Sequence, residues 1–213
     1  MDAREWDERY AAAELVWSAE PNRFVATELG GLPPGRALDL GAGEGRNAIW
    51  LAERGWQVTA ADFSGVALAK AAKLAASRGV SIDWVQADLT VYQPPAGYYD
   101  LVLLAYVHLP PAEWHAVLAM AAGALAPGGT LLAVGHDADN IAHGYGGPQV
   151  PEILHRADDV TAALPGLEIV SAGQARRAVT TDEGERFAID TVVRAQRPRD
   201  AARPQAERSG GAD

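Results

Sequence analysis

The sequence predicts an α/β protein with a doubly wound, mostly parallel sheet of seven strands. Three observations point to this fold. Short apolar runs alternate with helical segments along most of the chain, which is typical of strand–helix repeats. A glycine-rich loop, 41–45, joins the first of these strands to the helix after it. The last two strand-like runs, 167–179 and 185–195, flank the turn 181–184 and predict a closing antiparallel hairpin.

The first 35 residues precede the first predicted strand and look helical from Trp6 to Leu29, with a break at Pro21. Trp6 and Tyr10 place aromatic rings one helical turn apart. One interpretation is a helix that packs its aromatic stripe on the sheet. The other is a lid whose aromatic rings cover a ligand site.

The first strand, 37–40, contains Asp39 and leads into three glycines at alternate positions, Gly41, Gly43 and Gly45, before the helix 47–54. A dinucleotide fingerprint needs glycine where Arg46 stands, so that pattern fails here. A carboxylate at Asp39 would repel a pyrophosphate, but it can accept hydrogen bonds from a cationic amino-acid group. The loop therefore predicts a positively charged, phosphate-free nucleoside as its ligand. The alternative is an ordinary tight turn between strand and helix.

The second strand, 56–62, ends at Asp62, about twenty residues after the first glycine. This spacing is typical of a carboxylate that accepts hydrogen bonds from both hydroxyls of a ribose. Asp62 could instead cap the next helix, 65–78, but Ser64 is better placed for that role.

The third and fourth strands, 81–89 and 99–108, also end in candidate site residues. Asp88 closes the third strand, and an ordinary loop aspartate is the alternative interpretation. The fourth strand is a continuous apolar run, as expected for a central parallel strand buried on both faces. Its carboxyl end points at the cleft in such folds, so Tyr106 and His108 become candidate catalytic residues. His108 suits a general base near neutral pH, or it simply flanks the next helix.

The remaining elements follow the same alternation. A helix, 111–126, precedes the turn Leu125-Ala126-Pro127-Gly128-Gly129-Thr130-Leu131 and a fifth strand, 130–135. The stretch 136–156 is too rich in glycine and proline for regular structure, and it should overhang the cleft as a loop. A short helix, 158–164, leads into the closing hairpin.

Composition narrows the class of protein. The 213 residues suffice for one α/β domain, and the absence of cysteine excludes a disulfide, a thiolate metal site and a cysteine nucleophile. The net charge of -10 disfavours nucleic acid and anionic membranes as partners, because phosphate contacts need clustered Lys and Arg. The sequence shows no signal peptide and no apolar run long enough to span a bilayer, so we expect a soluble, cytoplasmic protein.

The acidic-x-G-x-G-x-G loop, Asp62, Asp88 and the Pro-Gly-Gly turn resemble the motifs of class I S-adenosylmethionine-dependent methyltransferases, in the same order. The opening Trp6-Asp7-Glu8-Arg9-Tyr10 resembles small-molecule members related to the tellurite-resistance type. The resemblance implies a Rossmann-like fold, S-adenosylmethionine as cofactor and transferase activity of EC class 2.1.1. It divides the chain into an N-terminal helical lid segment (1–35), a methyltransferase domain (36–197) and a disordered tail (198–213).

The resemblance also assigns site residues. Cofactor contacts are expected from the glycine loop and the strand ends: Asp39, Gly41, Ala42, Gly43, Arg46, Asn47, Asp62, Phe63, Ser64, Asp88, Leu89, Ala105 and Tyr106. Among these, Asp88 and the backbone N–H of Leu89 would bind the adenine ring. The N-terminal segment and the long loop supply the expected acceptor contacts: Tyr10, Trp17, His136, His143 and Tyr145. We expect no metal site, because the histidines of this loop lack the helical spacing of a known zinc motif.

These observations predict methyl transfer to a small-molecule acceptor, with His108 and Tyr106 as catalytic candidates. No Asn/Asp-Pro-Pro-aromatic sequence follows the fourth strand, which disfavours amino methylation of adenine or glutamine. The lack of cysteine removes the covalent route to C5 of cytosine. The alternative is a cofactor-binding regulator with the same fold and no methyl transfer. An NAD-dependent oxidoreductase is disfavoured by Arg46, and the sequence leaves the acceptor and the oligomeric state open.

Overall fold

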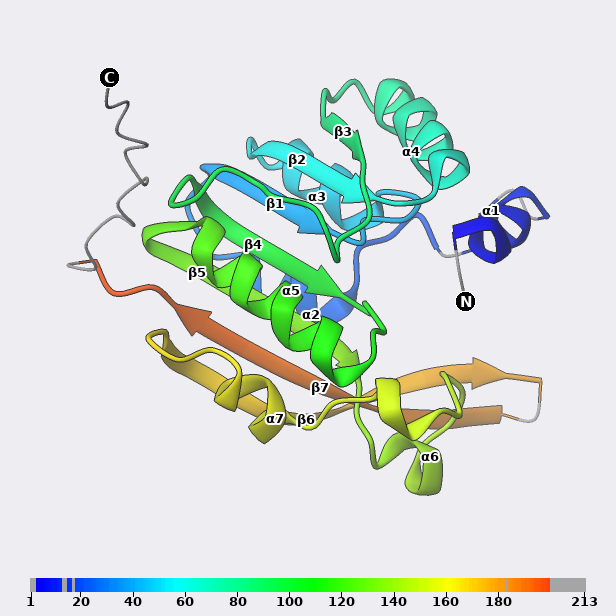
Figure 1. The fold of residues 1–213 in the computed structure, drawn as a ribbon. Coiled ribbons are helices and arrows are strands. Elements are labelled where there is room, and N and C mark those ends of the chain that lie inside the picture. Colours follow the sequence, from blue (N-terminus) through cyan, green and yellow to red (C-terminus); the bar gives the residue numbers. More distant parts are fainter. Residues whose placement is uncertain (1–2, 13–14, 17, 183, 200–213) are drawn as a thin grey trace, which may run out of the picture.

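The computed structural model describes residues 3–12, 15–16, 18–182 and 184–199, and these form one α/β unit (Figure 1). The seven strands are β1 (Arg36–Leu40), β2 (Gln57–Asp62), β3 (Asp83–Gln86), β4 (Tyr99–Ala105), β5 (Leu125–His136), β6 (Glu168–Thr181) and β7 (Gly184–Gln196). The helices are α1 (Ala3–Ala11), α2 (Arg23–Leu29), α3 (Arg46–Glu53), α4 (Gly65–Ser77), α5 (Pro111–Ala124), α6 (Asn140–His143), α7 (Ala157–Ala162) and a 3-10 turn (Pro151–Ile153).

The strands lie in the order β3-β2-β1-β4-β5-β7-β6. The pairs from β3 through β5 are parallel, whereas β7 pairs antiparallel with both β5 and β6. This confirms the predicted doubly wound sheet with its closing antiparallel hairpin. The chain adds strands on one side of β1 and then returns to add β4 on the other. The carboxyl ends of β1 and β4 therefore form the topological switch point, where open α/β sheets bind ligands.

The sheet separates two apolar cores, as the fourth strand shows most clearly. Leu101 and Leu103 of β4 belong to the core formed with α2 and α3, whereas Val102 and Leu104 belong to the core formed with α5 and α7. All four side chains are fully buried. Successive side chains of a strand point to opposite faces, so the continuous apolar run follows from burial on both sides.

Several predicted boundaries differ from the structure for local reasons. β4 ends at Ala105 rather than at His108, because Tyr106 adopts a φ of 60° that a strand does not allow. β5 begins at Leu125, before the Pro-Gly-Gly turn, through a register shift that pairs Leu125 with Tyr99. The predicted helix across this region consequently ends at Ala124. Within the stretch predicted to lack regular structure, α6 and the 3-10 turn form.

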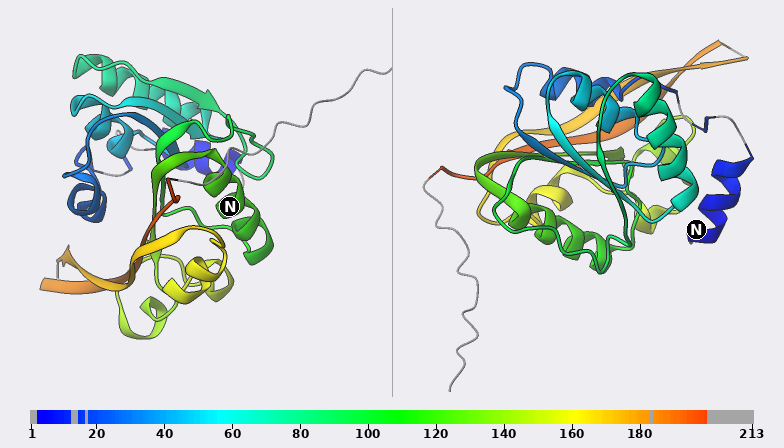
Figure 2. Two further views of the ribbon diagram at one scale, coloured as in Figure 1. Left: turned by 90° about the vertical axis from the view of Figure 1, so that its left-hand side faces the viewer. Right: turned by 90° about the horizontal axis from the view of Figure 1, so that it is seen from above.

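The N-terminal helix α1 packs against α4 and lies beside the sheet rather than on its face (Figures 1 and 2). The rings of Trp6 and Tyr10 stack with their centroids 5.4 Å apart, and Tyr10 is buried. This arrangement differs from a helix packed on the sheet, and the lid interpretation stays a prediction. In the described part of the chain, no helix combines the length and apolar character needed to cross a membrane.

The side chain of Asn140 links the long loop after β5 to strand β7 by hydrogen bonds. Its side chain is buried on α6, where Oδ1 accepts a hydrogen bond from the Ile189 N–H (2.7 Å) and Nδ2 donates to the Gly146 carbonyl (2.8 Å). Replacing Asn140 with Ala leaves both backbone groups without this partner. We expect Asn140→Ala to lower the free energy of unfolding by about 1–3 kcal/mol in urea titrations.

In Asn140→Ala, we also expect faster hydrogen exchange at the backbone amides of residues 144–150. Gln149→Ala, which removes a single 3.4 Å contact from an exposed side chain, is the matched control and should leave the midpoint unchanged. An unaltered midpoint in Asn140→Ala would show that the loop is held elsewhere.

Candidate cofactor site

None of the three glycine positions in the loop could carry a side chain without strain. Gly41, Gly43 and Gly45 have φ values of 74°, 54° and 77°, which L-residues with a Cβ rarely adopt. A Cβ on Gly43 would lie 2.8 Å from the Tyr10 hydroxyl, and one on Gly41 would lie 2.7 Å from a methyl carbon of Val107. Glycine therefore lets the loop pass close beneath α1 and beside the end of β4.

Asp39 is a buried carboxylate without a hydrogen-bond partner. Its side chain is 1 % exposed, and neither oxygen is paired within the described residues. Burial and the nearby Asp62 raise the pKa of Asp39 to about 7, although Arg46 and the backbone N–H of Ala48 oppose the shift. Burying an unpaired carboxylate costs free energy unless a cation or a hydrogen-bond donor pairs with it. At the end of β1, its two free oxygens fit the ammonium group of an amino acid.

The side chain of Asp62, at the end of β2, accepts hydrogen bonds from the glycine loop and from the residue that caps α4. Oδ2 accepts a hydrogen bond from the Gly43 N–H (2.8 Å), and Oδ1 accepts one from the Ser64 N–H (2.9 Å). Burial raises the pKa of Asp62, whereas these backbone donors oppose the rise. Each carboxylate oxygen keeps a further lone pair, so the side chain can still accept from a ribose diol. Ser64 caps α4 through its hydroxyl, which confirms the predicted N-cap.

Asp88 follows β3 and lies beside this pair of strand ends, because the Ala87 N–H donates to the Asp62 carbonyl (2.9 Å). Its Oδ1 accepts hydrogen bonds from the Thr90 N–H and hydroxyl (2.9 and 2.7 Å), which is the geometry of a loop aspartate. Oδ2 remains available for a ligand amine. Leu89 is buried close to Gly41, so the predicted adenine contacts adjoin the glycine loop.

The other predicted cofactor residues surround the same loop. Asn47 is buried, and its Oδ1 accepts from the Asn22 N–H (2.9 Å), which connects α3 to the start of α2. Burial lowers the pKa of Arg46, which lies within electrostatic range of Tyr106 and Asp39. The remaining residues contribute backbone or lie at strand ends: Ala42, Phe63 and Ala105.

The titration of Asp39 predicts a pH dependence for cofactor binding. With its pKa raised to about 7, Asp39 in the free protein is largely protonated below pH 7 and ionised above it. An ammonium group pairs with the ionised form. We therefore expect the dissociation constant for S-adenosylmethionine to rise by up to about tenfold for each pH unit below 7, as measured by calorimetry.

Asp39→Asn should flatten that profile, whereas Asp88→Asn should retain its slope. A flat profile between pH 5.5 and 8 in the unmodified protein would show that Asp39 does not meet the cation.

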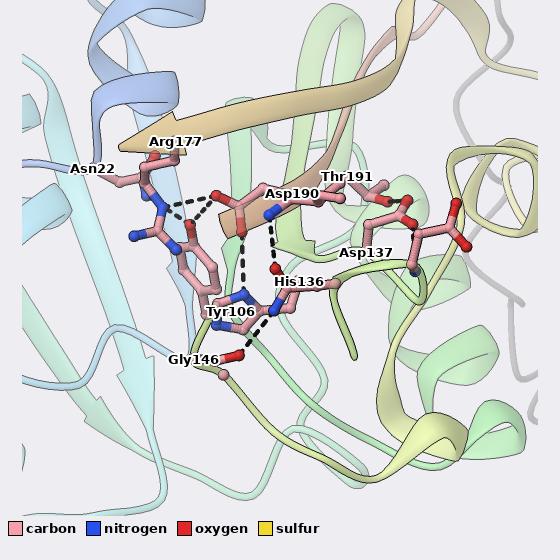
Figure 3. Close-up of polar contacts among 12 residues, drawn as sticks. Asn22, Tyr106, His136, Asp137, Gly146, Arg177, Asp190 and Thr191 are labelled. Atoms are coloured by element: carbon pink, nitrogen blue, oxygen red, sulfur yellow. Dashed lines mark hydrogen bonds and ion pairs between the residues drawn. The ribbon is translucent and has the colours of Figure 1, made fainter. Parts of the chain in front are cut away.

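Tyr106 directly follows β4 at the switch point, and Figure 3 shows its side chain between Arg177 and His136. Among the described residues it is the only non-glycine with a positive φ. Its hydroxyl donates to Asp190 Oδ2 (3.0 Å) and accepts from Asn22 Nδ2 (3.3 Å). Burial and Asp190 raise the pKa of Tyr106 to about 12. The hydroxyl therefore stays protonated and fixed near neutral pH, which suits orientation better than proton abstraction.

The two histidines nearest Tyr106 differ in their surroundings. His108 has a buried, unpartnered Nε2, and burial together with His136 lowers the pKa of His108 to about 4. His136 packs against Tyr106 with ring centroids 4.9 Å apart, and a Cβ on Gly147 would lie 2.9 Å from its ring. The structure thus brings both predicted catalytic residues next to one predicted acceptor contact.

The other predicted acceptor contacts are more dispersed. Tyr10 lies over Gly43, while His143 and Tyr145 are exposed on the loop after β5. Trp17 lies outside the described residues, as does the part of the predicted tail from residue 200 onward.

Sequence reasoning missed two residues of this cluster, Asp190 and Arg177. Asp190 of β7 is fully buried, and its Oδ2 accepts from Arg177 Nε of β6 at 2.7 Å. Burial alone would raise the pKa of Asp190, but contacts with His136 and Arg177 lower it below its usual value. The signal available in the sequence was a single acid, Asp190, within the mostly apolar run 187–193 of the last strand.

Comparison with known proteins agrees with this geometry. Residues 37–129, from β1 to the turn within β5, match the family described as "Methyltransferase domain". The chain is 37% identical over 101 residues to demethylmenaquinone methyltransferase of Thermus thermophilus, covering 46% of each chain. It is 36% identical over 110 residues to tRNA 5-carboxymethoxyuridine methyltransferase of Escherichia coli, covering 50% of this chain and 42% of the relative. The chain thus spans less than half the length of these curated relatives.

Solved structures share the fold at lower identity. The N-methyltransferase NodS of Bradyrhizobium japonicum, solved with S-adenosyl-l-homocysteine, superimposes with a TM-score of 0.69 at 19% identity over 93% of this chain and 100% of that one. TehB of Haemophilus influenzae gives a TM-score of 0.68 at 16% identity over 83% of this chain and 62% of that one. The chain therefore has the fold of these methyltransferases, and its residues 37–129 match the methyltransferase-domain family.

Proposed function

We propose that this protein transfers the methyl group of S-adenosylmethionine to a small-molecule acceptor. The observation that supports it most directly is the buried, unpartnered carboxylate of Asp39 beside three glycines that leave the backbone accessible. The ammonium group of the cofactor would pair with the Asp39 carboxylate, and its ribose hydroxyls would donate hydrogen bonds to Asp62. Its adenine would lie next to Asp88. When bound, the cofactor supplies an already activated methyl group on its sulfonium.

The protein's own contribution is to bind, orient and exclude water. α1 brings Tyr10 over the glycine loop and covers the nucleoside side of the site. On the acceptor side, the hydroxyl of Tyr106 is held by Asp190 and Asn22, so the wall of the cleft is fixed before an acceptor arrives. A fixed wall reduces the loss of conformational entropy that orientation would otherwise cost.

Two observations support a small acceptor over a nucleic acid, even though a tRNA methyltransferase is among the relatives. The chain carries a net charge of -10, which opposes the phosphate contacts that dominate nucleic-acid binding. The loop at Gly147 also packs closely against the ring of His136, the predicted acceptor contact, which leaves little room on that side of the ring. Both features favour a compact acceptor that enters the cleft.

The test is an S-adenosylhomocysteine release assay with matched acceptors: catechol, 1,4-naphthoquinol, a primary amine, benzenethiol, tellurite and bulk tRNA. We expect turnover with at least one small acceptor and none above background with tRNA. Turnover with tRNA alone would overturn the acceptor class. Tight cofactor binding with no turnover on any acceptor would favour the regulator instead.

A further inference from the structure

His136 and Asp190 face each other across two neighbouring strands. They are register partners at the end of β5 and on β7, and His136 Nδ1 lies 3.2 Å from Asp190 Oδ1 (Figure 3). The other carboxylate oxygen, Oδ2, is held by Arg177 Nε at 2.7 Å and by the Tyr106 hydroxyl at 3.0 Å. Asp190 is fully buried, and its Oδ2 is held by the scaffold. Its Oδ1 and His136 Nδ1 face each other at 3.2 Å without the alignment of a full hydrogen bond, and neither atom has another polar partner within the described residues.

This contact favours one tautomer of the ring, because only a proton on Nδ1 gives both buried atoms a partner. A carboxylate only accepts, so the neutral imidazole must carry its hydrogen on Nδ1, and Nε2 is left with a lone pair. Within the described residues, His136 Nε2 makes no hydrogen bond. The His136 side chain is 12% exposed, so the ring retains access to the cleft. Its neighbour His108 stacks nearly parallel to it, with centroids 5.6 Å apart, and restricts its rotation.

We propose that His136 and Asp190 form a general-base dyad that takes the proton of a hydroxyl acceptor during methyl transfer. This inference rests on the proposed function and deepens it by naming the acceptor group. Asp190 acts as the positioning residue and His136 as the catalytic residue. The arrangement follows the logic of any histidine base that is oriented by a buried carboxylate.

A hydroxyl is the acceptor group that most needs this dyad. A hydroxyl is protonated near neutral pH and becomes an adequate nucleophile only as its proton leaves. In the step, the acceptor oxygen forms a bond to the methyl carbon, and the carbon–sulfur bond breaks with its electron pair kept by sulfur. The O–H proton passes to His136 Nε2, and Asp190 stabilises the resulting imidazolium. The cations Arg177 and Arg46 near the same wall disfavour an ammonium acceptor.

The other titratable groups facing His136 suit the role less well. Tyr106 has its hydroxyl engaged on both sides, and burial raises its pKa to about 12. His108 has no carboxylate partner among the described residues, and burial lowers its pKa to about 4. Arg177 meets His136 only through Asp190. The dyad therefore ranks His136 above the two residues predicted from the sequence as catalytic.

The first test reads the tautomer directly and needs no acceptor. In 15N-labelled protein with S-adenosylhomocysteine added, we expect the neutral form of His136 to carry its proton on Nδ1 and not on Nε2. Asp190→Asn should change that pattern, and His136→Gln assigns the signal. A His136 protonated on Nε2 alone, or a spectrum that Asp190→Asn leaves unaltered, would overturn the dyad.

The second test separates catalysis from binding. We expect His136→Gln to lower kcat on a hydroxyl acceptor, catechol or naphthoquinol, by about 100-fold to 10,000-fold. The affinity for S-adenosylmethionine should stay within about threefold of the unmodified protein. His115→Gln, the same change at an exposed histidine of α5, is the matched control and should retain full activity. Added imidazole should restore part of the rate of His136→Gly, which a structural role would not allow.

Benzenethiol serves as an acceptor that does not need a base, because its sulfur is already ionised at pH 8. Its methylation should fall far less in His136→Gln than that of the hydroxyl acceptors. Equal losses on both acceptors, or full activity of His136→Gln on the hydroxyl, would overturn the proposal while the proposed methyl transfer stands. Failure of the unmodified protein to release S-adenosylhomocysteine with any acceptor would instead count against the proposed function.

Discussion

The Asp190→Ala variant should lose about 3 kcal/mol of its free energy of unfolding. Asp190 is fully buried and accepts from both Arg177 and the Tyr106 hydroxyl, so alanine leaves a guanidinium and a phenol without their partner. Removing one member of a buried ion pair costs about 3–5 kcal/mol. We expect the low end of that range, because the Arg177 side chain retains 25% exposure and can reach water. Urea unfolding followed by fluorescence measures the loss.

An exposed ion pair provides the matched control for that loss. Arg4 and Glu8 of α1 lie 3.2 Å apart and are both highly exposed, so Glu8→Ala should leave the unfolding midpoint unchanged. The Asp190 effect also has a pH signature. Because the folded-state pKa of Asp190 lies below its ordinary value, the stabilisation is present above that value and is lost as the pH falls through the folded pKa. Equal midpoints for Asp190→Ala and the unmodified protein would contradict the buried network.

The Asp62→Ala variant should bind S-adenosylmethionine about tenfold to 100-fold more weakly. The carboxylate would accept hydrogen bonds from the ribose, and a hydrogen bond to a charged group contributes about 1.5–3 kcal/mol. Alanine also frees the Gly43 N–H, which Asp62 holds at 2.8 Å, so the glycine loop loses its fixed position. Calorimetry on the folded variant, verified by circular dichroism, gives the dissociation constant.

Asp83→Ala serves as the control for charge, since Asp83 is an exposed acid on the neighbouring strand β3. It should bind the cofactor as the unmodified protein does. If both variants retained full affinity, the ribose would have to lie elsewhere.

The parts of the site that follow from local pattern could be predicted from the sequence. The alternate glycines and Asp62 belong to consecutive strand–loop–helix units, and parallel strands bring their carboxyl ends to one edge of the sheet. The positive φ at Tyr106 could not be foreseen, because an apolar run gives no sign of where a strand must end.

The His136–Asp190 contact depends on long-range register. These residues lie 54 positions apart, and only the pairing of β5 with β7 brings them opposite each other. Arg177 reaches the same carboxylate from a third strand. A shift of one residue in either pairing would turn these side chains to the other face of the sheet. Asn140 likewise looked like part of an irregular loop, although its amide fastens that loop to β7.

The central claim is that the glycine loop and its flanking carboxylates bind a cationic, phosphate-free nucleoside. Calorimetric titration of the unmodified protein at pH 8 with S-adenosylmethionine, and separately with NAD+, tests this claim most directly. We expect saturable one-to-one binding of S-adenosylmethionine and no measurable heat with NAD+. Binding of NAD+ without binding of S-adenosylmethionine would contradict it.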